Sequence, residues 1–379
     1  MAAGRQAKYL IGVVLVLAVA LVGLVLFRSR PTGEVRIGFM GPLTGEVGSI
    51  GMRMKNAAAL AVDEANATGG VAGRKLELVS RDDLMDPKTA TAALYGMIDA
   101  DKIACVLGTG MSAIVTAEAS VAGEKKIPLV TSSATAMALT GMNPYVFRVI
   151  PSNYFQAASL AKVAWQKYNF KRIAILFMQD DYSKDLKDAF TKEYTALGGV
   201  VTEAKGFEPT DTDFRVQLTA LAATRPDALF IPAQHVATAR ILLRAREMGL
   251  RFPFLAGETA FTEEVLKNAG RAAEGMAVAG SALDIKNPGA GLKKFTDDFK
   301  GKYGEDPDAY AAYTYDATLA LIAALKATKG AGGVKLRDEL AKVSGVPGVT
   351  GTITFDKNRE VPKDYQIIEV KAGKFVPVQ

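Results

Sequence analysis

Three small hydroxyl side chains stand where two neighbouring strands are predicted to end. Ser112 lies just past the apolar run 104–107, and Ser133 and Thr135 lie just past the apolar run 127–130. Small hydroxyls and backbone N–H groups at the start of a helix suit a carboxylate or a phosphate. Ser and Thr also favour turns and helix caps for local reasons. Ligand contact and plain turn chemistry therefore both stay open for these residues.

Glu258 is the acid whose position best fits a role in binding. It follows the predicted strand 254–256 and stands among small residues. A carboxylate there could pair with the ammonium group of a ligand; the alternative is a solvated loop acid. Tyr182 and Tyr310 could form apolar walls of the same pocket, or they could pack on the surfaces of their lobes.

The remaining reactive residues do not form a catalytic set. His235 is the single histidine, no serine stands in G-x-S-x-G, and no metal-ligand spacing is present. Cys105 lies inside an apolar run, as an inert buried thiol does. The acid pairs 82–83 and 180–181 follow strands and are predicted to be caps or hinge contacts. The sequence favours binding over catalysis, with no cofactor and no metal.

Residues 108–113 match the G-x-G-x-x-A pattern of a dinucleotide-binding turn. That pattern needs an acid at the end of the next strand to hold the ribose, and Thr131, Ser132 and Ser133 stand there instead. A dinucleotide enzyme is therefore disfavoured.

One strand–helix–strand unit positions the three hydroxyls. It comprises the two apolar runs and a helical pattern at about 113–124, so its strands are predicted to be parallel. Open parallel sheets hold ligands at the carboxyl ends of their strands. Further strands are predicted at 35–40, 76–79, 145–150, 172–178, 200–207, 228–232 and 254–256, with helices between them.

This alternation predicts an α/β fold with parallel sheets. The pattern restarts after Pro151, which indicates two similar lobes. The last third is more helical, and segments 349–355 and 365–370 are predicted to form an antiparallel pair.

The charge of the chain argues against nucleic acid as a partner. The 46 basic and 40 acidic residues give +6, but residues 1–33 hold four basic residues and no acid. Without those four, 42 basic residues face 40 acidic ones, a net +2. A near-neutral body lacks the basic footprint of a nucleic-acid-binding protein.

The N-terminus carries a hydrophobic segment. Arg5 and Lys8 precede an apolar run at 9–27, which is long enough to cross a bilayer. A cleavable signal usually has a shorter core. We therefore expect an uncleaved anchor at the inner membrane and a periplasmic body, with a cleaved signal as the alternative.

Several short motifs, in order and at matching spacing, resemble the type I periplasmic binding proteins, specifically the leucine/isoleucine/valine receptors of ABC transporters. The motifs lie at 37–45, 69–73, 81–87, 131–135, 181–182 and 313–317. The resemblance covers about residues 35–370. It implies two Rossmann-like lobes joined by a three-strand hinge. It places lobe 1 at 34–150 plus 281–350 and lobe 2 at 151–280 plus 351–379, after a signal or anchor at 1–33.

The resemblance also implies roles for individual residues. Ser112, Ser133 and Thr135 match positions that hold the ligand α-carboxylate and part of its ammonium group. Glu258 matches the acid that pairs with the ammonium group. Tyr182 matches a residue that closes over the ligand backbone. A further match is Tyr310, which corresponds to an aromatic residue near the ligand side chain.

The chain departs from this family pattern at four places. Ile50 stands where an aromatic residue often covers the ligand side chain, and Gln234 where an aromatic residue often contacts the ammonium group. Met85 and Met111 stand where a disulfide often joins two loops, so a thioether contact is expected in its place.

The expected function is that of a non-enzymatic, monomeric receptor that delivers a branched-chain or other aliphatic amino acid to an ABC transporter permease. Two alternatives remain. The same fold could bind an amide, a urea or an aromatic acid, or it could act as a membrane-anchored ligand sensor. A transcription repressor with similar lobes is excluded by the apolar segment and by the lack of a DNA-binding headpiece.

Overall fold

The computed structural model describes residues 33–280 and 289–378 of the chain. The expected anchor at 9–27 lies outside this part, as do residues 281–288 and 379. No helix within the described ranges has the length and apolarity that a membrane crossing requires.

The first sheet has five parallel strands in the order β2-β1-β3-β4-β5. Its strands are β1 (Val35–Gly41), β2 (Leu76–Asp82), β3 (Cys105–Gly108), β4 (Leu129–Thr131) and β5 (Val146–Arg148). Its central strands are apolar runs buried on both faces, as expected for a parallel sheet covered by helices. One face packs on α2 (Gly48–Ala67), α10 (Ala290–Tyr303), α11 (Ala309–Ala327) and α12 (Gly333–Leu340), and the other on α3 (Pro87–Asp99) and α4 (Ser112–Lys125).

The second sheet has seven strands in the order β14-β13-β10-β9-β8-β6-β7. Five of them are parallel: β6 (Arg172–Met178), β7 (Val200–Phe207), β8 (Ala228–Ile231), β9 (Phe254–Ala256) and β10 (Ala277–Gly280). The antiparallel edge is made by β13 (Gln366–Lys371) and β14 (Lys374–Pro377). One face packs on α5 (Asn153–Gln166) and α6 (Asp181–Ala196), and the other on α7 (Arg215–Ala223), α8 (His235–Glu247) and α9 (Glu263–Ala269).

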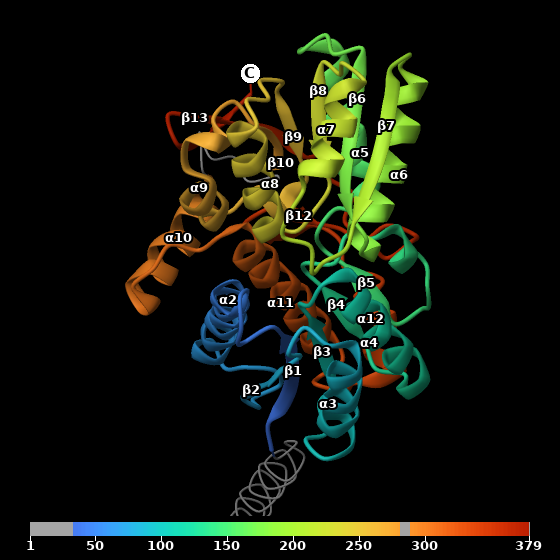
Figure 1. Cartoon of the computed structure of the whole chain (residues 1–379). Helices are drawn as coiled ribbons and strands as arrows, with labels where there is room; N and C mark the ends of the chain where they lie inside the picture. Colours follow the sequence, from blue (N-terminus) through green and yellow to red (C-terminus); the bar gives the residue numbers. More distant parts are fainter. Residues whose placement is uncertain (1–32, 281–288, 379) are drawn as a thin grey trace, which may run out of the picture.

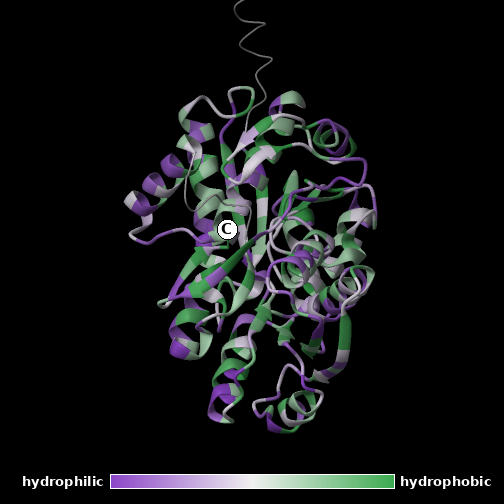
Figure 2. Ribbon diagram, turned by 90° about the horizontal axis from the view of Figure 1, so that it is seen from above, coloured by the Kyte–Doolittle hydropathy of each residue, from purple (hydrophilic) through white to green (hydrophobic). Residues whose placement is uncertain are grey.

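Each sheet therefore forms a three-layer αβα lobe with its own hydrophobic core, and Figure 1 shows the two lobes stacked one above the other. Figure 2 shows that the strands are mainly hydrophobic, while many helices have hydrophilic residues on part of their surface. This pattern fits helices that bury one face against a sheet. The expected α/β fold with parallel sheets is confirmed.

The C-terminal pairing predicted from the sequence is wrong. The first segment forms β12 (Gly351–Ile353), which pairs with β11 (Val346–Gly348), and the second forms β13, which pairs with β10 and β14. The two segments belong to different cores, because Phe355 packs in the first lobe and Val370 in the second. Alternating apolar residues indicate a strand but do not identify its partner.

The chain between these segments crosses from one lobe to the other. Val361 still packs in the first core, whereas the Tyr365 side chain packs in a core of the second lobe and its hydroxyl donates to the carbonyl of Pro151 at 2.9 Å. The chain also changes lobe between β5 and α5, and between β10 and α10. The parallel strands of the two lobes point their carboxyl ends at the space between the sheets, the usual ligand position in such folds.

Candidate functional site

A cavity of about 280 Å³ lies between the two lobes. It is near the small end of the range of ligand pockets, roughly 300–1,000 Å³, which suits a ligand of a few heavy atoms. The first lobe contributes the loop before α2, the N-terminus of α4, the turn after β4 and the start of α11. The second lobe contributes the N-termini of α6 and α8 and the turn after β9.

The first-lobe wall contains a helix N-terminus without a side-chain cap. Helix α4 begins at Ser112, and its capping residue Met111 accepts no hydrogen bond through its side chain. Ser112 and Ser133 both line the cavity. The Ser133 hydroxyl donates to the carbonyl of Gly110 at 2.8 Å, and the Ser112 hydroxyl accepts from the backbone of Ala136 at 3.3 Å. The N–H groups of the first turn and the helix dipole therefore favour an anion on this wall.

Thr135 occupies a different position from the other two hydroxyls. It is buried but is not among the residues that line the cavity. Its hydroxyl has no hydrogen-bond partner among the described residues. Its contact with a ligand stays a prediction. Ile50 on α2 and Tyr310 at the start of α11 do line the cavity.

Glu258 and Tyr182 meet on the second-lobe wall. Both side chains are buried and line the cavity, and the Tyr182 hydroxyl donates to Glu258 Oε2 at 2.9 Å. The backbone N–H of Glu258 donates to Gln156 Oε1 at 2.8 Å, which fixes the turn after β9. Gly257 allows this close approach, because a Cβ atom there would lie 2.2 Å from the Tyr182 hydroxyl.

Tyr182 lies in the first turn of α6. The helix begins at Asp181, because the Asp180 side chain caps it by accepting from Ser183 N at 2.7 Å. The other Asp180 oxygen accepts from the Gln234 amide at 3.0 Å, so the starts of α6 and α8 are tied together. Gln234 lines the cavity next to this link.

Burial controls the ionisation of Glu258. Desolvation raises the pKa of its carboxyl to about 7, although hydrogen bonds from Tyr182, Gln156 and Tyr310 act in the opposite direction. Burial and the nearby Glu258 charge raise the pKa of Tyr182 and Tyr310 well above the usual value, so both phenols remain hydrogen-bond donors. A cation beside Glu258 would stabilise its charged form.

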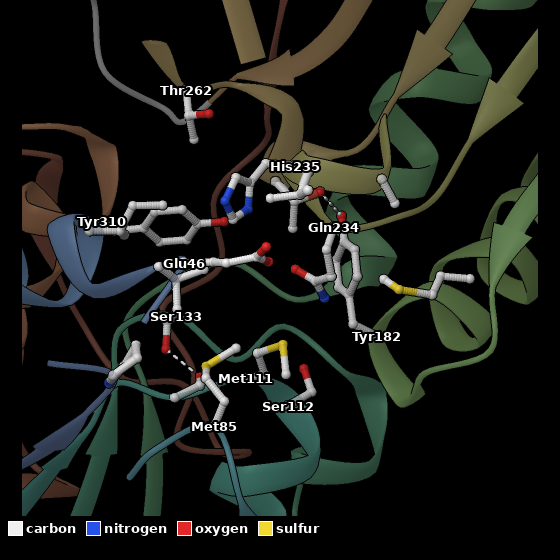
Figure 3. A pocket seen from close by; sticks show the side chains of 18 of the residues that line it. Glu46, Met85, Met111, Ser112, Ser133, Tyr182, Gln234, His235, Thr262 and Tyr310 are labelled. Atoms are coloured by element: carbon white, nitrogen blue, oxygen red, sulfur yellow. Dashed lines mark hydrogen bonds between the residues drawn. The ribbon is translucent and has the colours of Figure 1, made fainter. Parts of the chain in front are cut away.

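The structure also brings residues to the cavity that sequence reasoning did not single out for it. Among them are Glu46, His235 and Arg240, which line it together with Met85 and Met111. Figure 3 shows Met85 and Met111 on the same side of the cavity, near Ser112 and Ser133. These side chains come from loops and helix ends far apart in the sequence, so spacing along the chain does not reveal them.

The two acids after β2 support the loops around the site, in line with the predicted structural role. Asp82 accepts from the backbone of Leu43 at 3.0 Å and from the Thr44 hydroxyl at 2.6 Å. Asp83 accepts from Met85 N at 2.8 Å. These bonds position the loop before α2 and the loop that carries Met85 against the cavity.

Asp83 is also one of two buried carboxyl groups close to the start of α4. Its Oδ2 atom and both carboxylate oxygens of Glu118 have no hydrogen-bond partner in the described part of the chain. Burial raises the pKa of Asp83 to about 6 and that of Glu118 well above its usual value, with the Asp83 charge adding to the effect. Burial thus favours the protonated form of Glu118. Across residues 33–280 and 289–378, no three His, Cys, Asp or Glu residues come together in a way that could hold a metal ion.

Comparison with known proteins gives a consistent result. The periplasmic binding protein family matches residues 34–374. An amino acid binding protein of Pseudomonas aeruginosa is 26% identical over 359 residues, which cover 93% of this chain and 95% of the relative.

Two solved structures share the fold closely. A leucine binding protein from Thermotoga maritima has a TM-score of 0.83 and 30% identity, and the match covers 91% of this chain and 98% of that one. A branched-chain amino acid transporter substrate binding protein from Streptococcus pneumoniae, solved in complex with isoleucine, has a TM-score of 0.83 and 28% identity, with 91% and 99% covered. Together with the family match over most of its length, these similarities show that the chain belongs to the type I periplasmic binding protein family.

Proposed function

We propose that this protein is an extracytoplasmic receptor that binds a small α-amino acid between its lobes and delivers it to an ABC importer in the membrane. The observation that carries this proposal is the pairing of two opposite walls. One wall presents the uncapped start of α4 at Ser112, and the other presents the buried acid Glu258. An α-amino acid carries a carboxylate and an ammonium group on one carbon, so it matches both walls at once.

The individual contacts follow from this arrangement. The ligand carboxylate would meet the N–H groups of α4 with Ser112 and Ser133, and its ammonium group would meet Glu258. Tyr182 would close over the ligand backbone. Tyr310, Ile50 and Gln234 would surround the start of the side chain, and Thr135 would support the carboxylate end from behind the wall.

The two solved structures favour an aliphatic ligand, because one is a leucine binding protein and the other was solved in complex with isoleucine. Met54 and Met178 also line the cavity and would supply apolar contacts to a ligand side chain. We propose binding without catalysis, since the polar groups of the cavity match the two resting charges of an amino acid.

We propose that closure of the two lobes produces the surface that the permease reads. Lobe 1 would comprise 34–150 and 281–350, and lobe 2 would comprise 151–280 and 351–379, with the three connections as the hinge. The packing of Phe355 and Val361 in the first core favours moving the last boundary to 361–365. The protein would act as a monomer and without nucleic acid.

We also propose that residues 9–27 hold the protein at the inner membrane. The mass of the mature protein in isolated membranes tests this, because cleavage would remove the apolar run.

The test of the receptor assignment is the substitution Glu258→Gln. Removing one partner of a buried charge pair costs about 2–5 kcal/mol, which corresponds to roughly 30-fold to several-thousand-fold weaker binding. The full-length protein, purified in detergent, would be titrated with leucine, isoleucine and valine by calorimetry. Glu118→Gln is the matched control, since Glu118 is also buried but does not line the cavity. Unchanged affinity in Glu258→Gln would sink the assignment.

A further inference from the structure

The cavity continues beyond the groups that suit an amino-acid head group. A second hollow lies against α8 and is lined by Glu46, Val236, Ala239, Arg240, Leu243 and Asn268. Three of these residues, Glu46, Val236 and Arg240, also line the first cavity. The two spaces therefore meet, and a ligand held at Glu258 has room to extend outward.

Two opposite charges stand where the spaces meet. Glu46 comes from the loop before α2 in the first lobe, and Arg240 comes from α8 in the second. Both side chains are exposed, and within residues 33–280 and 289–378 no hydrogen bond or ion pair joins either of them to another residue. Asp211 also lines the cavity, but its carboxylate accepts from Glu208 N at 2.9 Å. Glu46 and Arg240 are thus the charged groups there that are available to a ligand.

The path between the head group and these charges follows the start of α8. Gln234 caps this helix and His235 is its first residue, and both line the first cavity. Arg240 comes five residues after His235, which places its backbone about 7.5 Å further along the helix axis. Figure 3 shows Glu46 reaching into the cavity towards His235. Burial lowers the pKa of His235, although the charges of Glu264 and Glu46 oppose the shift, so the imidazole faces these acids in its neutral form.

We propose that the ligand is an amino acid whose side chain runs along the start of α8 and ends between Glu46 and Arg240 in a neutral group that both donates and accepts hydrogen bonds, as a carboxamide does. This inference rests on the proposed receptor function, and it assigns the ligand a polar side chain in place of the aliphatic one that the relatives favour. Glu46, Arg240 and His235 would then be the residues that determine specificity.

The charges select a neutral polar group for a simple reason. A side-chain ammonium group would be attracted by Glu46 and repelled by Arg240, and a side-chain carboxylate would experience the reverse. A carboxamide can donate its NH₂ to Glu46 and accept from Arg240 through its oxygen. An aliphatic end would cover both charged groups without replacing their bonds to water, which costs free energy.

The experiment compares glutamine, lysine and leucine as probes on the full-length protein. We expect glutamine to bind at least about tenfold more tightly than leucine, because a hydrogen bond to a charged group contributes about 1.5–3 kcal/mol. Glu46→Leu and Arg240→Leu should each weaken glutamine binding about tenfold or more while leucine binds within about threefold of its original affinity. Glu193→Leu on α6 and Arg251→Leu after α8 are matched controls, because neither residue lines either space.

The outcomes separate the two proposals. Glutamine binding no more tightly than leucine, or equal losses for both ligands in Glu46→Leu and Arg240→Leu, would overturn this inference and leave the receptor function standing. Lysine as the tightest ligand would also overturn it, in favour of a cation held by Glu46. If none of the three amino acids binds a folded protein, the receptor proposal fails and this inference fails with it.

Discussion

At the scale of single residues, the buried position of Glu258 and its hydrogen bond from Tyr182 make its carboxyl group a suitable partner for a cation. The side chain is almost entirely removed from water, which raises its pKa to about 7, yet Tyr182 already donates a hydrogen bond to it. The hydrogen bond from Tyr182 therefore offsets only part of the free energy that the carboxylate loses when it is removed from water. An ammonium group would supply the missing charge and favour ionisation.

Ligand binding should consequently release a proton. Below pH 7 the carboxyl of Glu258 is largely protonated in the ligand-free protein, and pairing with an ammonium group needs the carboxylate. We expect close to one proton to be released at pH 6 and little release at pH 8, with affinity falling as the pH drops below 7. Calorimetry at pH 6 in two buffers of different ionisation enthalpy measures this directly.

The raised pKa of Glu258 also determines how the stability of the ligand-free protein changes with pH. The folded pKa of Glu258 lies above the ordinary value of 4.5, so the ligand-free fold loses stability as the pH rises from about 4.5 to 7. Asp83 titrates nearby with a pKa of about 6, and Asp83→Asn therefore serves as the control. Proton release that disappears in Asp83→Asn, or that is absent at pH 6 in the unmodified protein, would contradict the role of Glu258.

At the scale of helices and strands, the sequence correctly predicted those site residues that directly follow a parallel strand. Ser112, Ser133 and Glu258 follow parallel strands, and all three line the cavity because such strands bring their carboxyl ends to one edge. Glu46 and His235 were not assigned to the pocket, because they come from a loop and a helix start whose position depends on how the lobes face each other. Thr135 shows the same limit, since residues two apart in a turn need not face the same space.

The prediction failed at the C-terminus for a related reason. Segments 349–355 and 365–370 have the apolar pattern of strands, but they pack into different lobes. Periodicity is a local property, whereas strand partners depend on contacts distant in sequence. The missed strand β10 is a short run, Ala277–Gly280, with too few residues to show a period.

Two glycines, one in α2 and one in α3, test how tightly α2 packs against the loop before it. Gly51 lies inside α2, and a Cβ atom there would approach the carbonyl oxygen of Pro42 to 1.7 Å. Gly96 lies inside α3, and a Cβ atom there would meet nothing within 4 Å. We expect Gly51→Ala to destabilise the protein by about 1–3 kcal/mol through overpacking, and Gly96→Ala to stabilise it by about 0.5–1 kcal/mol.

Urea unfolding of both variants measures these effects. Gly51→Ala should also weaken ligand binding, because the loop that starts at Pro42 carries Glu46 to the cavity. Equal unfolding midpoints for the two variants would show that α2 can shift away from the loop at no cost.

At the scale of the whole molecule, the two lobes touch on opposite sides of the cavity as well as through their three connections. On one side Arg53 of α2 reaches Glu264 of α9 at 2.8 Å. On the other, the Met137 N–H donates to Asp185 of α6 at 2.9 Å. These contacts depend on how far the lobes are closed, because each joins a residue of the first lobe to one of the second.

The contact between Arg53 and Glu264 should therefore help to set the balance between open and closed forms. Arg53 is anchored within its own lobe by Asp308 at 2.8 Å, so its charge stays at the edge of the cleft when the lobes part. Because the ligand binds the closed form more tightly, any contact that favours closure also strengthens ligand binding. Loss of a partly exposed ion pair costs about 1 kcal/mol, so Glu264→Gln should weaken binding about fivefold, mainly through faster dissociation.

Glu305→Gln is the matched control, because Glu305 lies 3.7 Å from the same guanidinium but belongs to the first lobe. Stopped-flow measures the rate of ligand dissociation, and solution scattering of the ligand-free protein measures how far the lobes are closed. Equal changes in the two variants would mean that Arg53 needs only a nearby negative charge. The contact between Arg53 and Glu264 would then not be what holds the lobes closed.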